Sequence, residues 1–306
     1  MPHVNLEGIH HITAITGDAP GNVDFYARVL GLRLVKKTVN QDDPTVYHLF
    51  YADEEGSAGT DLTFFDYPGA APGTAGDGMV HRVVWRVASE DAYDFWEQRL
   101  SSEGVDVARG AGSLRFSDHE GFDHELLVVD VPDPPLMADH PDVPSEHALQ
   151  GFHAVRAYIG DPEASRPLFE EALAFEPIDG GWEARGAERG GLYLADPPPP
   201  ERGRPGGGTV HHVAWSSALG PEHEEWRRRA AAAGAPVTPL IDRFYFKSIY
   251  FREPSGVLFE IATRGPGFTV DQPLDELGTT LALPPFLEPR RAEIEAALQP
   301  LPAPRR

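Results

Sequence analysis

The sequence predicts an α+β protein made of four copies of one unit, in which a strand is followed by a helix and three further strands. The first observation is a strand pattern with a His-His pair, which occurs as "GIHHITAIT" and "TVHHVAWSS", with weaker copies "MVHRVVWRV" and "GFHAVRAYI". Recurrence of such a pattern along the chain indicates a repeating structural unit. When the four copies are aligned, the second-histidine position is occupied by His11, Arg82, Ala154 and His212.

The second observation is a helix signal after each of these strands. Apolar side chains recur at helical spacing, a capping residue or proline opens each stretch, and glycine ends most of them. Short alternating segments such as "TVYHLFYAD" and "KSIYFREP" then follow, separated by turns rich in Gly, Pro and Asp, and they predict the remaining strands. The predicted helices span residues 19–31, 90–104, 162–175 and 221–234.

A third observation divides the four units into two halves. The stretch "VPDPPLMADHPDVPSEHALQ" is rich in Pro and Asp and has no useful periodicity, so it is the natural linker. We therefore expect an N-terminal pair of units over 1–130, a linker over 131–150 and a C-terminal pair over 151–265. A tail over 266–306 is expected to pack in extended form and to end in a short helix. A second irregular stretch, "ADPPPPERGRPGGG", is most simply a surface loop.

Composition excludes several classes of function. With 26 basic and 48 acidic residues the net charge is −22, which argues against nucleic acid and anionic membranes as partners. The absence of cysteine excludes disulfides, thiolate nucleophiles and cysteine-bound metals, so any metal must be held by His, Asp or Glu. No segment is typical of a membrane-spanning helix or a secretory signal, and we expect a cytoplasmic protein.

Strand alternation selects three side chains for one face. In "VHHVAWS" the bulky Val and Trp share a face with His211, so His212 lies on the opposite face with small and polar residues. The same alternation places His11 of "IHHITAI" and Glu260 of "VLFEIAT" on the corresponding face. These three side chains are candidates for one concave site.

Glu260 is the decisive member of this set. Burying an ionised carboxylate among apolar neighbours costs on the order of several kcal/mol, so Glu260 needs a cation or must stay protonated. Two neutral imidazoles and one carboxylate on one side of a divalent metal leave its other positions open, as in non-haem iron(II) oxygenases. A single histidine in a strand is more often structural, but its recurrence together with the glutamate favours a metal site.

Other polar residues near these strands receive structural interpretations. Glu125 of "FDHELLVV" is in register with Glu260, but the partner positions hold Arg82 and Ala154, which cannot complete a triad. We therefore expect Glu125 to pair with Arg82. His10 and His211 are interpreted as packing residues or as supports behind the metal ligands.

The sequence resembles the vicinal oxygen chelate superfamily, and within it the ring-cleaving dioxygenases that open hydroquinones. The resemblance covers essentially the whole chain. It is most specific in the opening block "GIHHITAITGDAPGNVDFYARVLG" and in "DRFYFKSIYFREPSGVLFEIATRGPGF". It implies that the four βαβββ modules form two curved mixed sheets, each a half-barrel, with the helices packed outside.

The same resemblance implies a set of site residues. Iron(II), with Mn(II) as the alternative, would be bound by His11, His212 and Glu260, between the first and last modules. Arg243 would hold an ionised phenolate or superoxide, and Tyr250 or His211 would move protons. The positions that match the lining of that active site are His10, Thr13, His211, Arg243 and Tyr250. Phe244, Tyr245 and Phe246 are candidate wall residues.

The expected activity is cleavage of a small aromatic diol, of hydroquinone or catechol type, with O2. Two alternatives stay open at this point. One is a redox-neutral, glyoxalase-like lyase or isomerase that prefers zinc, nickel or manganese. The other is a non-catalytic protein that binds an aromatic compound or drug. The ring substituents are left open, and a homo-oligomer is compatible with the sequence.

Overall fold

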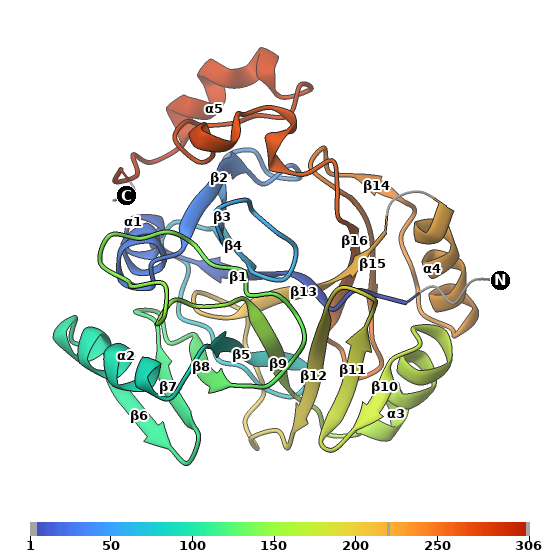
Figure 1. Cartoon of the computed structure of the whole chain (residues 1–306). Coiled ribbons are helices and arrows are strands. Elements are labelled where there is room, and N and C mark those ends of the chain that lie inside the picture. The colour runs from blue at the N-terminus through green and yellow to red at the C-terminus, as the bar shows by residue number, and fades with distance from the viewer. Residues whose placement is uncertain (1–4, 219–220, 304–306) are drawn as a thin grey trace.

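The computed structural model describes residues 5–218 and 221–303, and its strands form two curved, eight-stranded mixed sheets (Figure 1). The first sheet comprises β1 (Ile9–Thr16), β2 (Arg33–Val39), β3 (Tyr47–Ala52), β4 (Asp61–Asp66), β13 (Val210–Ser217), β14 (Ile241–Asp242), β15 (Lys247–Arg252) and β16 (Leu258–Thr263). The second comprises β5 (Met79–Val87), β6 (Val107–Gly110), β7 (Ser113–Ser117), β8 (Asp123–Val128), β9 (Phe152–Tyr158), β10 (Glu176–Ile178), β11 (Gly181–Arg185) and β12 (Gly190–Asp196). The predicted α+β class with two curved sheets is confirmed.

Each sheet joins modules from different parts of the chain. The first has the order β14-β15-β16-β13-β1-β4-β3-β2, so it unites the first and fourth modules. The second has the order β10-β11-β12-β9-β5-β8-β7-β6 and unites the second and third. Both junctions, β1–β13 and β5–β9, are antiparallel. The boundaries 1–130, 131–150, 151–265 and 266–306 stay predictions.

The helices follow the first strand of each module. They are α1 (Ala19–Val23) continued by the π-helix η1 (Asp24–Val29), α2 (Asp91–Ser102), α3 (Pro162–Arg166) continued by the π-helix η2 (Pro167–Ala172), and α4 (Pro221–Ala232). Asp18 caps α1 by accepting a hydrogen bond from the Gly21 N–H at 3.2 Å. The helices predicted over 19–31 and 162–175 each change from α- to π-helical geometry, at Asp24 and at Pro167.

The bulky faces of the strands form the core beneath these helices. Trp215 and Phe259 are fully buried in it, and Phe169 of η2 stacks on Phe259 with ring centroids 5.5 Å apart. Burial of one such side chain contributes roughly 1.5–3 kcal/mol. Packing between the third and fourth modules therefore helps to hold the two sheets together. No described helix is long and apolar enough to cross a membrane.

The C-terminal tail packs against the first sheet, beside β2 and β3 (Figure 1). It contains η3 (Phe268–Val270), η4 (Leu274–Glu276), η5 (Glu288–Arg290) and the short helix α5 (Arg291–Ala297). Lys36 of β2 is fully buried under it and donates hydrogen bonds to the Phe268 carbonyl at 3.1 Å and to Asp271 and Gln272 at 2.7 and 2.6 Å. These contacts anchor the tail on the first sheet through a buried charged side chain.

Candidate metal centre

Three adjacent strands bring His11, His212 and Glu260 together. His11 lies on β1, His212 on β13 and Glu260 on β16, and all three side chains are buried. The Nε2 atoms of the two histidines are 3.3 Å apart, and they lie 3.3 and 3.0 Å from Glu260 Oε2. In the described part of the chain, this is the group of His, Asp and Glu whose ligand atoms converge closely enough to hold a metal ion.

The buried Glu260 carboxylate shows that this donor set fits a cation. Its Oε2 atom has no hydrogen bond of acceptable geometry within the described residues, although two imidazole nitrogens lie close to it. The other oxygen accepts a hydrogen bond from the Ser248 hydroxyl. An anionic oxygen and two imidazoles that face one point suit a divalent metal.

Local irregularities in the β1–β13 ladder explain how adjacent histidines can touch. Ile9 pairs with Trp215 and His11 with Ala214, so His10 is an extra residue on β1. On β13, His211 is the extra residue in the same way. Successive residues of a regular strand point to opposite faces, whereas a bulge changes the direction of the extra side chain. The bulges leave the second histidine of each pair on the concave face, as predicted.

Hydrogen bonds behind the triad determine which nitrogen of His11 is free. His10 Nε2 lies 3.1 Å from the Thr263 carbonyl, which can only accept, so this nitrogen carries the proton. Burial, followed by His11, lowers the pKa of His10 to about 3, so His10 is neutral and its Nδ1 is an acceptor. His11 Nδ1 is 3.0 Å away and must be the donor, which leaves His11 Nε2 with a lone pair toward Glu260.

His211 supports His212 in the same way. The two Nδ1 atoms are 2.8 Å apart. Burial, followed by His212, lowers the pKa of His211 to about 4, and burial also lowers the pKa of His212. Neutral imidazoles in this contact let His212 donate from Nδ1 and keep Nε2 bare for a metal. His211 then presents its own Nε2–H to the cavity that it lines.

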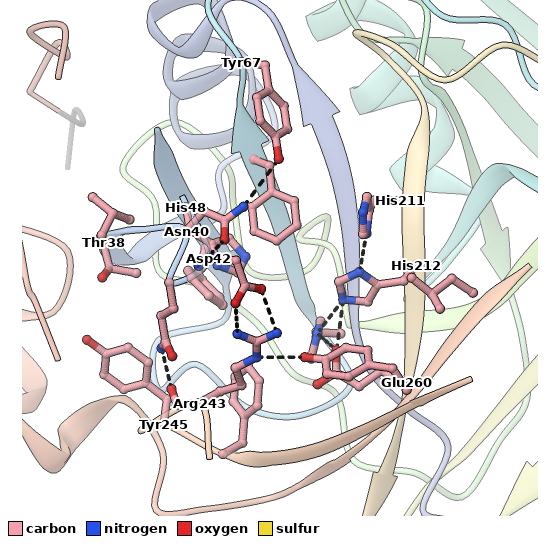
Figure 2. A pocket seen from close by; sticks show the side chains of 18 residues that line it. Thr38, Asn40, Asp42, His48, Tyr67, His211, His212, Arg243, Tyr245 and Glu260 are labelled. Carbon is pink, nitrogen blue, oxygen red and sulfur yellow. Dashed lines mark hydrogen bonds and ion pairs between the residues drawn. The ribbon is translucent and has the colours of Figure 1, made fainter. Parts of the chain in front are cut away.

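A cavity of 350 Å³ opens onto the triad (Figure 2). The Tyr245 and Phe246 side chains form part of its wall, as predicted, and further aromatic lining comes from Phe50 and Phe65. Phe244 does not line it. Its φ of 70° is unusual for a bulky residue and turns the loop between Arg243 and Tyr245.

Arg243 and Tyr250 line the cavity and contact each other. The Arg243 Nε–H donates to the Tyr250 hydroxyl at 3.3 Å, and both terminal nitrogens donate to Asp42 at 3.1 and 2.9 Å. Burial, followed by Glu260, raises the pKa of Tyr250, so its phenol stays protonated. Because Arg243 supplies the hydrogen atom of their contact, the Tyr250 proton remains available for another acceptor.

The remaining predicted residues lie behind the cavity wall or in the second sheet. His10 contacts His11 from behind, and the Thr13 hydroxyl lies 2.8 Å from that of Thr63, and neither side chain lines the cavity. Glu125 pairs with Arg82 at 3.5 Å, as expected, and also with Arg115 at 3.1 Å.

Sequence reasoning missed His48, Asp42 and Ser248. His48 and Asp42 line the cavity, and Ser248 holds Glu260. The alternation in "YHLFYA" places His48 on one face with Phe50, which was a usable signal. This alternation could identify His48 as a site residue only if the strand order was known. The pairing of β3 with β4, and of β4 with β1, is what brings this face of β3 near the triad.

Known proteins agree with this architecture. The family model of the Glyoxalase/Bleomycin resistance protein/Dioxygenase superfamily matches residues 8–134 and 151–261. A protein of Bacillus subtilis named as a ring-cleaving dioxygenase, MhqA, is 41% identical, with 97% of this chain and 100% of that protein covered. The chlorohydroquinone/hydroquinone 1,2-dioxygenase of Sphingobium indicum is 33% identical over 94% of this chain and 95% of its own.

Solved structures show the same fold. A crystal structure of a Bacillus subtilis protein named as a dioxygenase has a TM-score of 0.92 and 37% identity, covering 99% of this chain and 100% of that one. Glyoxalase I from Zea mays has a TM-score of 0.61 at 16% identity, covering 84% and 92% of the two chains, and shows likeness of fold alone. The chain belongs to the Glyoxalase/Bleomycin resistance protein/Dioxygenase superfamily, and its homologues include proteins named as ring-cleaving dioxygenases.

Proposed function

We propose that the protein is an iron(II)-dependent ring-cleaving dioxygenase that opens a hydroquinone-type aromatic diol with O2. His11, His212 and Glu260 would hold the metal, with Mn(II) as the alternative ion. The observation that carries the proposal is the convergence of two bare imidazole nitrogens and one buried carboxylate oxygen beneath an aromatic-lined cavity. When bound there, iron(II) supplies the electron-transfer chemistry that lets O2 react with an aromatic ring.

The surrounding residues would orient the substrate and handle its protons. The aromatic walls formed by Phe65 and Phe246 suit a flat ring and limit the access of water. Tyr250 keeps a proton that it can donate to an oxygen of the bound molecule, and Arg243 fixes the tyrosine while adding a positive charge. His211 offers a second N–H donor. Together these groups favour an anionic oxygen in the cavity.

The position symmetrical to Glu260 argues against a redox-neutral isomerase. Glu260 pairs with Ala214 on β13, and the equivalent pair on β1 and β4 is Thr13 with Thr63. An isomerase that removes a proton beside a carbonyl needs a base at the metal, for which a second carboxylate here would be the simplest choice. The Thr63 hydroxyl cannot serve as that base at neutral pH.

The proposal is tested by loading the metal-free protein with iron(II), zinc or nickel without oxygen and assaying both reaction types. The iron form should consume O2 with hydroquinone or catechol, and the zinc and nickel forms should not isomerise a thiohemiacetal. Isomerisation without oxygen uptake by the iron form would replace the proposal with the lyase alternative. Aromatic binding without either reaction would indicate a binding protein.

We also propose the partners and the location of the protein. The small aromatic diol and O2 would be its partners, and the net charge of −22 disfavours nucleic acid and anionic membranes. A cytoplasmic location is part of the same proposal. Whether the chain forms a homo-oligomer stays open.

A further inference from the structure

We propose that His48 determines substrate specificity by donating a hydrogen bond from Nδ1 to a substrate oxygen. This is the oxygen attached to the aromatic ring at the position opposite the metal-bound hydroxyl. This inference rests on the proposed function, because it assigns His48 to the second oxygen of a para-diol. It predicts a preference for rings that carry a hydrogen-bond acceptor opposite the metal-bound hydroxyl.

The position of His48 suits this role. The strand order β13-β1-β4-β3 places β3 two strands from β1, roughly 10 Å in the plane of the sheet. Figure 2 shows His48 on the opposite side of the cavity from His212 and Glu260. The space between them can therefore take one aromatic ring.

Packing holds the imidazole in place. Its ring centroid lies 4.0 Å from that of Phe50 and 4.4 Å from that of Phe65. His48 is half-buried and lines the cavity. A side chain packed against two aromatic rings has few accessible rotamers, so it keeps its orientation toward a ligand.

The hydrogen-bond chain behind His48 fixes its tautomer. The Thr13 and Thr63 hydroxyl oxygens are 2.8 Å apart, and Thr63 Oγ1 lies 2.9 Å from His48 Nε2. If Thr13 donates to Thr63 and Thr63 donates to Nε2, both buried hydroxyl protons are used. The reverse direction leaves the fully buried Thr13 hydroxyl proton without an acceptor within the described residues, which is the costlier arrangement.

The favoured direction leaves the proton of the neutral His48 ring on Nδ1. With Nε2 accepting from Thr63, the proton of the neutral ring is on Nδ1, which has no hydrogen-bond partner in the described part of the chain. Burial lowers the pKa of His48 well below its usual value, so the ring stays neutral. In the proposed role this N–H faces the cavity, where it can donate to an oxygen lone pair but cannot accept a hydrogen bond.

Ligand binding without oxygen tests the direction of this bond. The iron(II)-loaded protein would be titrated by calorimetry with hydroquinone, 4-methoxyphenol and 4-ethylphenol. Methoxyphenol offers only an acceptor at the para position, and ethylphenol is its apolar counterpart of similar shape. Hydroquinone and methoxyphenol should both bind about 3- to 10-fold more tightly than ethylphenol, as expected for one hydrogen bond.

Variants separate His48 from general effects on the cavity. His48→Phe keeps an aromatic ring between Phe50 and Phe65 but has no donor, so all three ligands should bind alike. His48→Asn places an amide near the position of Nδ1 and should restore part of the preference. Thr63→Val removes the group that fixes the tautomer, and it should weaken methoxyphenol more than hydroquinone, which can donate or accept. The matched control is His119→Phe, which changes a partly exposed histidine outside this cavity.

Each outcome decides the proposal. Loss of the preference in His48→Phe, with ethylphenol binding unchanged, supports it. A preference for hydroquinone but not for methoxyphenol would show that His48 accepts and would overturn the tautomer. An unchanged preference in His48→Phe would overturn the role itself. Absence of oxygen uptake with any diol, alongside a His48-dependent preference in binding, would instead remove the proposed reaction and leave the recognition site.

Discussion

At the residue scale, the imidazole protons decide whether the buried cluster can bind a metal. The Thr263 carbonyl sets the tautomer of His10, and His10 in turn leaves Nε2 of His11 bare. Alternation alone predicted that the second histidine of each pair and Glu260 share a face, because it depends only on strand geometry. The hydrogen bonds behind the pairs and the role of Ser248 could not be predicted, because they depend on which strands are neighbours.

The metal content of alanine variants should separate the two proposed ligand histidines from the two histidines behind them. His11→Ala and His212→Ala are expected to abolish binding, and Glu260→Gln should remove most of it. His10→Ala and His211→Ala should weaken affinity by about 10- to 100-fold, as loss of a supporting hydrogen bond does. Elemental analysis of folded variants, with folding checked by circular dichroism, measures the ranking. If the His10 and His211 variants lost more metal than the His11 and His212 variants, the assignment of ligands would be wrong.

Arg243→Ala should keep the metal and lose turnover. Arg243 contacts Tyr250 and Asp42 and is not among the proposed ligands, so metal content should stay near that of the unchanged protein. Removing a charge-assisted contact to the reacting molecule costs about 2–4 kcal/mol, or roughly 30- to 1,000-fold in kcat. Oxygen uptake normalised to bound iron measures this loss. Full turnover in the variant would exclude a role in the reaction.

Asp61 should make stability depend on pH. Its side chain is 1% exposed, and neither carboxylate oxygen has a hydrogen-bond partner among the described residues. Burial, followed by Asp53, raises its pKa well above the usual value. The folded state therefore binds a proton more tightly than the unfolded state, and the free energy of unfolding falls as pH rises from about 4, by at most about 1.4 kcal/mol per pH unit.

Asp61→Asn should remove this dependence. Urea denaturation of the metal-free proteins at pH 5 and pH 8 would compare the two. At each pH the free energy of unfolding of the unchanged protein is subtracted from that of the variant. This difference should be more favourable to the variant at pH 8 than at pH 5. An equal difference at both pH values would show that Asp61 does not titrate in this way.

At the scale of elements, the repeated histidine marks a bulge in every module. The skipped residues of the β5–β9 ladder are His81 and His153, in the positions that His10 and His211 occupy in the first sheet. The repeated histidine could therefore have indicated four bulges. The alternation used to assign faces assumes a regular strand, so it does not detect an extra residue. Helix spacing likewise predicted the helices but not the π-helical turns of η1 and η2.

Gly278 should be essential for docking of the tail on the first sheet. Its φ is 74°, and an added Cβ would overlap the Leu34 carbonyl oxygen. Gly278→Ala therefore cannot be accommodated without moving the backbone, and we expect a loss of more than about 2 kcal/mol in the free energy of unfolding. Urea denaturation measures it.

Gly180→Ala is the matched control for this change. Gly180 has a similar φ of 76°, but no atom lies within 4 Å of the position of its added Cβ. It should cost only the left-handed backbone strain, about 1–2 kcal/mol. Equal losses in the two variants would mean that contact with β2 does not restrain the tail.

At the scale of the whole molecule, the candidate metal centre lies at a seam between the two halves of the chain. His11 is on β1 and His212 on β13, the two strands that pair across the first-sheet junction. The aligned positions in the second sheet hold Arg82 and Ala154. The fold is therefore repeated, but the pair of candidate metal-binding histidines is not. Repetition could be predicted from the sequence. The pairing of first with fourth module followed from where the ligands lie and from the resemblance, not from the order of the modules.

The most direct test of the central claim is the fate of labelled oxygen. The iron(II)-loaded protein would be given hydroquinone and ¹⁸O2, with uptake followed by electrode and the product by mass spectrometry, and Glu260→Gln would be run in parallel. We expect that one O2 is consumed for each ring opened, that the product gains the mass of two oxygen atoms with label incorporated, and that Glu260→Gln forms no product. Formation of benzoquinone with no label in the product, or equal activity in Glu260→Gln, would contradict it.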